Sequence, residues 1–117
     1  MSKIKATVVI YTNEEKTSYQ INGIFQENDK KIIYKEPDNT KTVFDYNSKI
    51  LLRENDELKM EYPFIENEIS KGRIFIKNLN KSIEIEIKTK NIIIKQQNLE
   101  IDYIIEDNKF KYKIEVK

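Results

Sequence analysis

Apolar and charged side chains alternate toward the end of the chain, first in residues 83–88 and then from Leu99 to Val116. Because successive side chains on an extended backbone point to opposite faces, this pattern predicts strands and not a helix. Each strand then has one apolar and one polar face, which is typical of an antiparallel sheet with one solvated side. The pattern therefore predicts an all-β protein.

Shorter alternating runs continue along the whole chain, separated by Asn-rich segments. Asn accepts the left-handed backbone of tight turns more readily than other non-glycine residues, and the chain has only two glycines. Residues 63–72 are the least strand-like and are expected to form a loop or one helical turn. We predict strands at residues 3–12, 17–27, 30–36, 40–47, 49–54, 57–64, 73–78, 82–89, 92–96, 98–106 and 109–116.

Two hairpins can be predicted with their registers. A two-residue loop at Asp107 and Asn108 would set apolar pairs on one face. On the other face it would place Asp102 opposite Lys113 and Glu106 opposite Lys109, which is favourable, and Glu100 opposite Glu115, which is not. A second tight turn over residues 89–92 would pair Ile87 with Ile94. The apolar pairs predicted for the final hairpin are Ile105 with Phe110, Tyr103 with Tyr112, Ile101 with Ile114 and Leu99 with Val116.

Evenly spaced antiparallel strands form either a sandwich or an up-and-down barrel. Sequential tight hairpins favour the barrel, and closure removes the strand edges that a chain rich in Ile would otherwise expose. The length of 117 residues suits one domain, and the charges are scattered along the strands, as in a folded chain. We therefore expect one antiparallel up-and-down β-barrel over residues 1–117.

The sequence gives no sign of a membrane segment or a signal peptide. No run approaches the roughly 18 apolar residues of a membrane-spanning helix, and the apolar run at residues 6–10 is short and β-branched, as in a first strand. The chain has no Cys, which suits a reducing compartment. We expect a cytoplasmic protein that does not bind a membrane.

The absence of His and Cys removes the commonest general base, the usual zinc and copper ligands and most nucleophile systems. The two glycines are too far apart for a phosphate-binding loop. Carboxylates such as Glu36, Asp38 and Asp45 could pair in space, but acidic residues spaced along strands usually form the solvated face. We expect neither an enzyme nor a bound metal or cofactor.

Polar residues near the middle of the chain are candidates for ligand binding. Arg53 follows three apolar residues and could point into a barrel, where its planar fork would hold a ligand carboxylate; it could equally lie on the outer wall. Tyr34, Glu36, Thr40 and Thr42 flank the turn at residues 37–39, where they either line a mouth or stabilise the turn.

Two further candidates are aromatic. Tyr62 alternates with charged residues beside Met60 and Phe64, a pattern that indicates core packing more than a lipid-contacting wall. Tyr103 faces Tyr112 in the predicted hairpin, as a packed aromatic pair or as a polar spot inside the barrel.

Nucleic-acid binding is not expected. Lys109, Lys111 and Lys113 form an outward row, but the neighbouring aromatic residues point to the opposite face, where they cannot stack on bases. The net charge of +1 gives a weak electrostatic footprint.

The order and spacing of several short motifs resemble those of the YwiB-like family, small bacterial proteins of unknown function. The resemblance implies a calycin-like or lipocalin-like β-barrel and a cytoplasmic bacterial protein, and it supplies no activity. Asn55 departs from the family pattern, in which a Gly is expected. The resemblance rests on Gly23, residues 34–36, residues 40–42, Arg53, Phe64, Thr89, residues 99–103 and residues 112–114.

Two hypotheses for function follow. The barrel could bind an apolar or amphipathic small molecule inside, with Arg53 or a tyrosine as polar anchor. Alternatively, its own side chains could fill it, and it would act as a protein-interaction or structural module through a surface patch or sheet edge.

Overall fold

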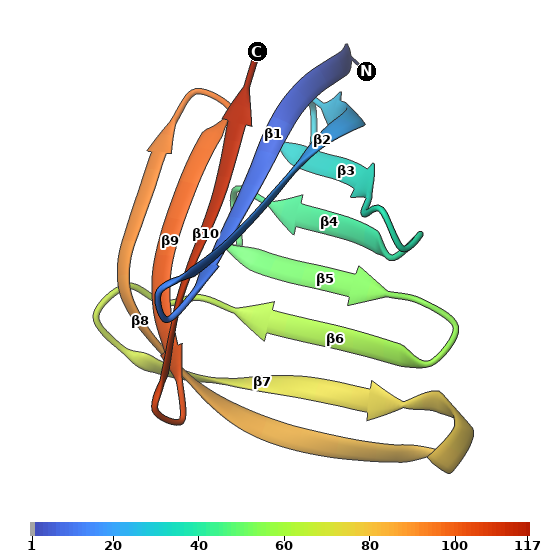
Figure 1. The fold of residues 1–117 in the computed structure, drawn as a ribbon, viewed down its shortest axis with the longest axis vertical. Coiled ribbons are helices and arrows are strands. Elements are labelled where there is room, and N and C mark those ends of the chain that lie inside the picture. Colours follow the sequence, from blue (N-terminus) through green and yellow to red (C-terminus); the bar gives the residue numbers. More distant parts are fainter. Residues whose placement is uncertain (1) are drawn as a thin grey trace.

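The computed structural model describes residues 2–117 and shows a closed antiparallel barrel of ten strands (Figure 1). Each strand pairs with the next along the chain, and β1 pairs with β10 to close the ring. The predicted all-β up-and-down barrel is confirmed. The strands are β1 (Ser2–Thr12), β2 (Glu15–Gln26), β3 (Lys31–Lys35), β4 (Lys41–Asp45), β5 (Ile50–Glu54), β6 (Leu58–Pro63), β7 (Ile69–Ile76), β8 (Lys81–Lys95), β9 (Asn98–Ile105) and β10 (Asn108–Val116).

Two long strands, β2 and β8, turn the corners of the barrel. β2 pairs with β1 along most of its length but meets β3 only from Ile24 onward. β8 pairs with β7 as far as Lys88 and with β9 from Ile87. Strands β3–β7 therefore run across β1, β9, β10 and the second half of β8, as Figure 1 shows, and the two groups of strands diverge beyond each corner.

Both glycines lie in strands beside these corners, and neither has a positive φ. A Cβ atom on Gly23 would lie 2.9 Å from the carbonyl oxygen of Ile33, and one on Gly72 would lie 2.8 Å from Cδ1 of Ile87. Real Cβ atoms do not approach other heavy atoms so closely. The glycines therefore permit close packing where the sheet bends, and other residues form the turns.

Within residues 2–117, eight non-glycine residues have a positive φ, all between strands or at strand ends. Four are Asn, as the composition predicts, and the others are Lys, Gln or Glu. A three-residue 3₁₀ helix, η1 (Lys77–Leu79), precedes one of them. Within residues 2–117 no helix is long and apolar enough to cross a membrane. The positive-φ residues are Asn13, Lys30, Asn39, Lys49, Asn67, Asn80, Gln96 and Glu106.

The predicted turn over residues 89–92 is wrong, because β8 runs through it as one strand with a bulge at Lys90. Neither Lys90 nor Asn91 has the positive φ that a tight turn needs. Ile87 pairs with Ile105 of β9, and not with Ile94. Beyond Lys88, β8 no longer pairs with β7, and the loop before β7 hydrogen-bonds to it instead. Asn67 in this loop donates its N–H to the Thr89 carbonyl at 2.8 Å. β7 itself begins at Ile69, inside the segment that was expected to be a loop.

The predicted register of the final hairpin is wrong by two residues, because the turn lies at Glu106 and Asp107. A two-residue shift keeps every side chain on its own face, so the apolar pattern does not distinguish the two registers. The charge pairs do distinguish them. The observed register places Lys113 opposite Glu100, with Nζ 3.6 Å from Oε1, whereas the predicted register places Glu115 opposite Glu100. The observed apolar pairs are Phe110 with Tyr103, Tyr112 with Ile101 and Ile114 with Leu99.

Candidate ligand-binding site at one end of the barrel

A pocket of about 220 Å³ lies inside the barrel, toward the end that holds the β3–β4 and β9–β10 turns. Its apolar wall comes from opposite sides of the barrel and includes Ile10, Leu51, Ile105 and Phe110. Polar side chains from seven strands or their ends complete the lining. These are Thr12, Tyr19, Tyr34, Glu36, Arg53, Tyr62, Tyr103 and Tyr112.

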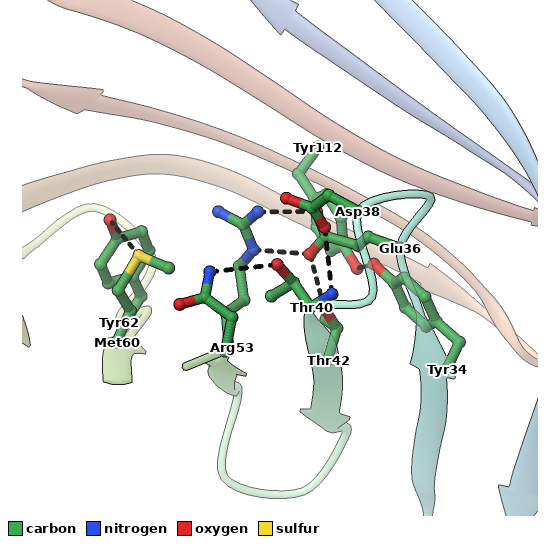
Figure 2. A network of polar contacts seen from close by, with 10 residues as sticks. Tyr34, Glu36, Asp38, Thr40, Thr42, Arg53, Met60, Tyr62 and Tyr112 are labelled. Carbon is green, nitrogen blue, oxygen red and sulfur yellow. Dashed lines mark hydrogen bonds and ion pairs between the residues drawn. The ribbon is translucent and has the colours of Figure 1, made fainter. Parts of the chain in front are cut away.

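The charged centre of the pocket is a two-pronged ion pair between Arg53 and Glu36 (Figure 2). Nε and Nη2 of Arg53 each donate to one carboxylate oxygen at 2.6 Å, and the Thr42 hydroxyl donates to Oε2 of Glu36, also at 2.6 Å. The Glu36 side chain is 9% exposed and that of Arg53 is 30% exposed. Burial by itself lowers the pKa of Arg53, but the hydrogen bonds and charge of Glu36 outweigh it and raise that pKa.

The β3–β4 turn sets the position of Glu36. Its N–H donates to the Thr40 carbonyl at 2.9 Å, and its own carbonyl accepts from Asn39, which has a φ of 69°. Asp38 accepts a hydrogen bond from the Thr40 N–H at 3.0 Å, and its hydrogen bonds with Thr40 lower the pKa of this carboxyl. On the next strand, Arg53 lies directly opposite Thr42 in the β4–β5 register. Local turn chemistry and strand register thus bring the three side chains together.

Tyrosines line the rest of the polar wall. The hydroxyls of Tyr34 and Tyr112 hydrogen-bond to each other across the barrel, and burial raises the pKa of both phenols well above the usual range. The Tyr19 hydroxyl is buried without a hydrogen-bond partner among the described residues, and burial together with the Glu36 charge raises its pKa to about 12. Burial also raises the pKa of Tyr103. These phenols therefore stay neutral at physiological pH.

The predicted site residues largely meet in this pocket. Arg53 points inward, with its fork on Glu36 and not free for a ligand, and Thr42 lies behind the ion pair. Thr40 is buried and accepts a hydrogen bond from Asn55 at 3.3 Å, which is a turn-stabilising contact. Tyr34, Tyr62 and Tyr103 line the pocket.

The predicted pairing of Tyr103 with Tyr112 is not found. Tyr103 instead stacks on Phe110, with ring centroids 5.1 Å apart, and the Tyr112 hydroxyl forms a hydrogen bond with the Tyr34 hydroxyl. Sequence reasoning missed Tyr19, although it is in phase with the buried Ile21 on β2, a periodicity that marks it as inward-facing.

The opposite end of the barrel carries a wider groove of about 930 Å³, lined largely by Lys, Gln, Asn and Glu side chains. The Tyr46 hydroxyl donates to the Gln97 carbonyl at 2.6 Å and links β4 to the β8–β9 turn at this end. The groove also borders the core, since Phe25, Tyr46 and Ile94 contribute to its lining. Within residues 2–117 no group of three or more acidic side chains is placed to hold a metal ion.

Fold and site together define a small closed antiparallel barrel with a polar cluster at one end of an otherwise apolar interior. A search of solved structures found the same fold in the crystal structure of the ywiB protein from Bacillus subtilis. The TM-score is 0.72 at 14% sequence identity, over 98% of this chain and 92% of that one. The likeness to YwiB expected from the sequence is thus confirmed for the fold.

No protein-family model matches the chain. No curated protein matches it either. Only the site itself therefore indicates the function of this chain.

Proposed function

We propose that this protein binds a small amphipathic molecule in the pocket beside Arg53. The observation that carries the proposal is the Arg53–Glu36 ion pair inside the barrel. Burying such a pair costs several kcal/mol per ion in desolvation, and apolar residues of similar volume often give equal or better stability. A chain that needed only a packed barrel gains little from this pair, whereas a binding site gains a fixed polar anchor.

The shape of the interior supports the same proposal. The middle of the barrel is filled by fully buried side chains, among them Ile32, Phe44, Phe64 and Ile101. The pocket beside Arg53 remains open, and its 220 Å³ is smaller than the roughly 300–1,000 Å³ of sites for drug-sized ligands. The ligand is therefore small, with an apolar part against Ile10, Leu51 and Phe110 and a polar part at Arg53.

Native mass spectrometry of the protein, purified without added ligand from cells that express it, tests this proposal. A small molecule that is retained in stoichiometric amount and released on denaturation is the expected result. Arg53→Ala should abolish retention, while Arg73→Ala, the matched change of the exposed arginine on β7, should leave it intact. A ligand-free mass, with no binding of apolar fluorescent probes, would contradict the proposal.

We also propose a cytoplasmic location for the protein. The absence of Cys supports it, because disulfides stabilise many small proteins in oxidising compartments.

A second candidate function is the binding of an extended peptide at the free edge of β8. Residues 81–86 pair with β7 on one side only, because β9 ends at Ile105, opposite Ile87. Ile83 and Ile69 are 46% and 60% exposed beside this edge. A groove of about 460 Å³ runs here, and its charged lining residues are Glu84, Glu86, Glu106 and Lys88. The edge therefore suits an added strand that alternates apolar and basic residues.

Fluorescence anisotropy with a labelled hexapeptide of alternating Val and Lys tests this second function. We expect it to bind more tightly than the matched peptide of Val and Glu. Ile83→Lys should abolish binding, whereas Leu79→Lys, at an exposed apolar residue of η1, should not. Equal binding of the two peptides, or of the two variants, would argue against strand addition.

A further inference from the structure

The pocket presents more hydrogen-bond donors than acceptors. The Arg53 guanidinium has five N–H donors, and its contacts with Glu36 use one on Nε and one on Nη2. Within residues 2–117, its Nη1 group has no hydrogen-bond partner. The opposite edge of the guanidinium, formed by Nη1 and the second proton on Nη2, is therefore available to a ligand.

Two tyrosine hydroxyls can supply further donors to this wall, although each can also accept a hydrogen bond. Tyr19 has a buried hydroxyl without a partner among the described residues. Among the described residues, the only hydrogen-bond partner of the Tyr62 hydroxyl is the Met60 sulfur at 3.8 Å, which is a weak acceptor. A group that satisfies such a wall must carry acceptor atoms, because an unpaired buried donor is costly.

The charges around the pocket further restrict the class of ligand that it can bind. Both Glu36 oxygens are already engaged, by two N–H groups of Arg53 and by the Thr42 hydroxyl, so this carboxylate is committed to the protein. The ion pair sums to zero charge, and the neighbouring phenols are neutral. An anionic ligand would bring a net negative charge into the pocket, and a cationic ligand would find no free carboxylate; either one is expensive to desolvate.

Building on the proposed binding function, we infer that the ligand carries an uncharged acceptor group, such as a carboxamide, ester or ketone carbonyl. The carbonyl oxygen accepts from the free edge of Arg53, and its apolar chain lies against Leu51 and Phe110. The internal Glu36 carboxylate thus acts as a selectivity device, because it neutralises the cation that would otherwise attract acids.

Four probes with the same carbon chain test this inference: hexanamide, methyl hexanoate, hexanoate and hexylamine. Each is titrated into the labelled protein at neutral pH and followed by ¹H–¹⁵N NMR shifts. We expect hexanamide and methyl hexanoate to bind at least about tenfold more tightly than hexanoate or hexylamine, since a site built for one polar group rejects mismatched ligands strongly. The shifted amides should surround the pocket.

The variant Glu36→Gln tests the role of the carboxylate. It keeps the size and one acceptor oxygen of the side chain but leaves the Arg53 charge uncompensated, so hexanoate should become the tighter ligand by at least about threefold. Glu61→Gln, at an exposed carboxylate on β6, is the matched control and should keep the wild-type order. The comparison of ester with acid on the wild-type protein decides the inference even where Glu36→Gln does not fold.

The outcomes separate the two proposals. Tighter binding of hexanoate than of hexanamide to the wild-type protein would overturn the inference and leave the pocket as a binding site. If none of the four probes binds, both the inference and the proposed function are overturned.

Discussion

Breaking the Arg53–Glu36 pair from each side should destabilise the fold unequally. Arg53→Met keeps the length and apolar stem of the side chain and leaves Glu36, 9% exposed, with the Thr42 hydroxyl as its remaining hydrogen-bond donor. Glu36→Gln instead leaves the uncompensated charge on Arg53, which is 30% exposed and reaches solvent more easily. Because Glu36 is the more buried partner, leaving its charge unpaired should lower the free energy of unfolding more than leaving the Arg53 charge unpaired.

The size of the effect follows from this exposure. Removing one partner of a fully buried pair costs about 3–5 kcal/mol. Because the Arg53 end is partly solvated, we expect about 2–3 kcal/mol for Arg53→Met and about 1–2 kcal/mol for Glu36→Gln. The double variant has no unpaired charge, so it should be more stable than the sum of the single losses predicts.

Urea denaturation at neutral pH, followed by circular dichroism, measures these differences. The control is Glu54→Gln, which breaks the exposed ion pair with Lys77, 2.9 Å long, and should leave the unfolding midpoint nearly unchanged. If Arg53→Met is no more destabilising than the control, the carboxylate is solvated when its partner is lost, and the argument for a costly buried pair fails.

Three further results are expected. The folded pKa values of Tyr34 and Tyr112 are raised, so the stability that these phenols contribute is fully present below pH about 10 and lost as the pH rises further. In an alkaline titration, the absorbance of ionised tyrosine should therefore grow together with unfolding. Ionisation of all seven tyrosines before unfolding would contradict the burial of Tyr34 and Tyr112. Gly72→Ala should cost about 1–3 kcal/mol in urea denaturation, because its Cβ would meet Ile87; an unchanged midpoint would refute this. Thr89→Val should be neutral or stabilising by up to about 1 kcal/mol, because the buried Thr89 hydroxyl has no partner within residues 2–117; a loss of stability would reveal a hydrogen bond.

Strand alternation was enough to predict the all-β class, because the burial of one face imposes its period on the sequence. Closure was predicted from the sequential tight turns and from the edges that an open sheet would expose. The alternation could not locate the bulge in β8, since Lys90 and Asn91 are plausible turn residues whose conformation depends on partners far along the chain. The predicted register of the final hairpin was wrong for a different reason. A shift of two residues preserves both faces, and the registers differ in their charge pairs, among them Glu100 with Lys113 in the observed one.

The candidate site shows the same division. Arg53 and Tyr34 could be predicted as candidates because they are polar residues in the inward phase of short strands. The partner that fills the Arg53 fork could not, because it depends on the β3–β4 turn placing Glu36 beside Thr42 across two strand registers. Sequence pattern thus indicates which residues face inward, and strand register decides which of them meet.

The position of the pocket follows from the topology. The part of β2 that precedes Ile24 does not pair with β3, so the segment that carries Tyr19 has no strand neighbour on that side. The two strands diverge toward the end of the barrel where Arg53 lies. Apolar side chains fill the middle of the barrel, and polar ones gather at the end where β2 and β3 separate. The hypotheses of a filled barrel and of a binding barrel therefore describe two parts of one molecule: a packed middle that holds the strands in register, and an open end whose polar wall this rigid support holds in place.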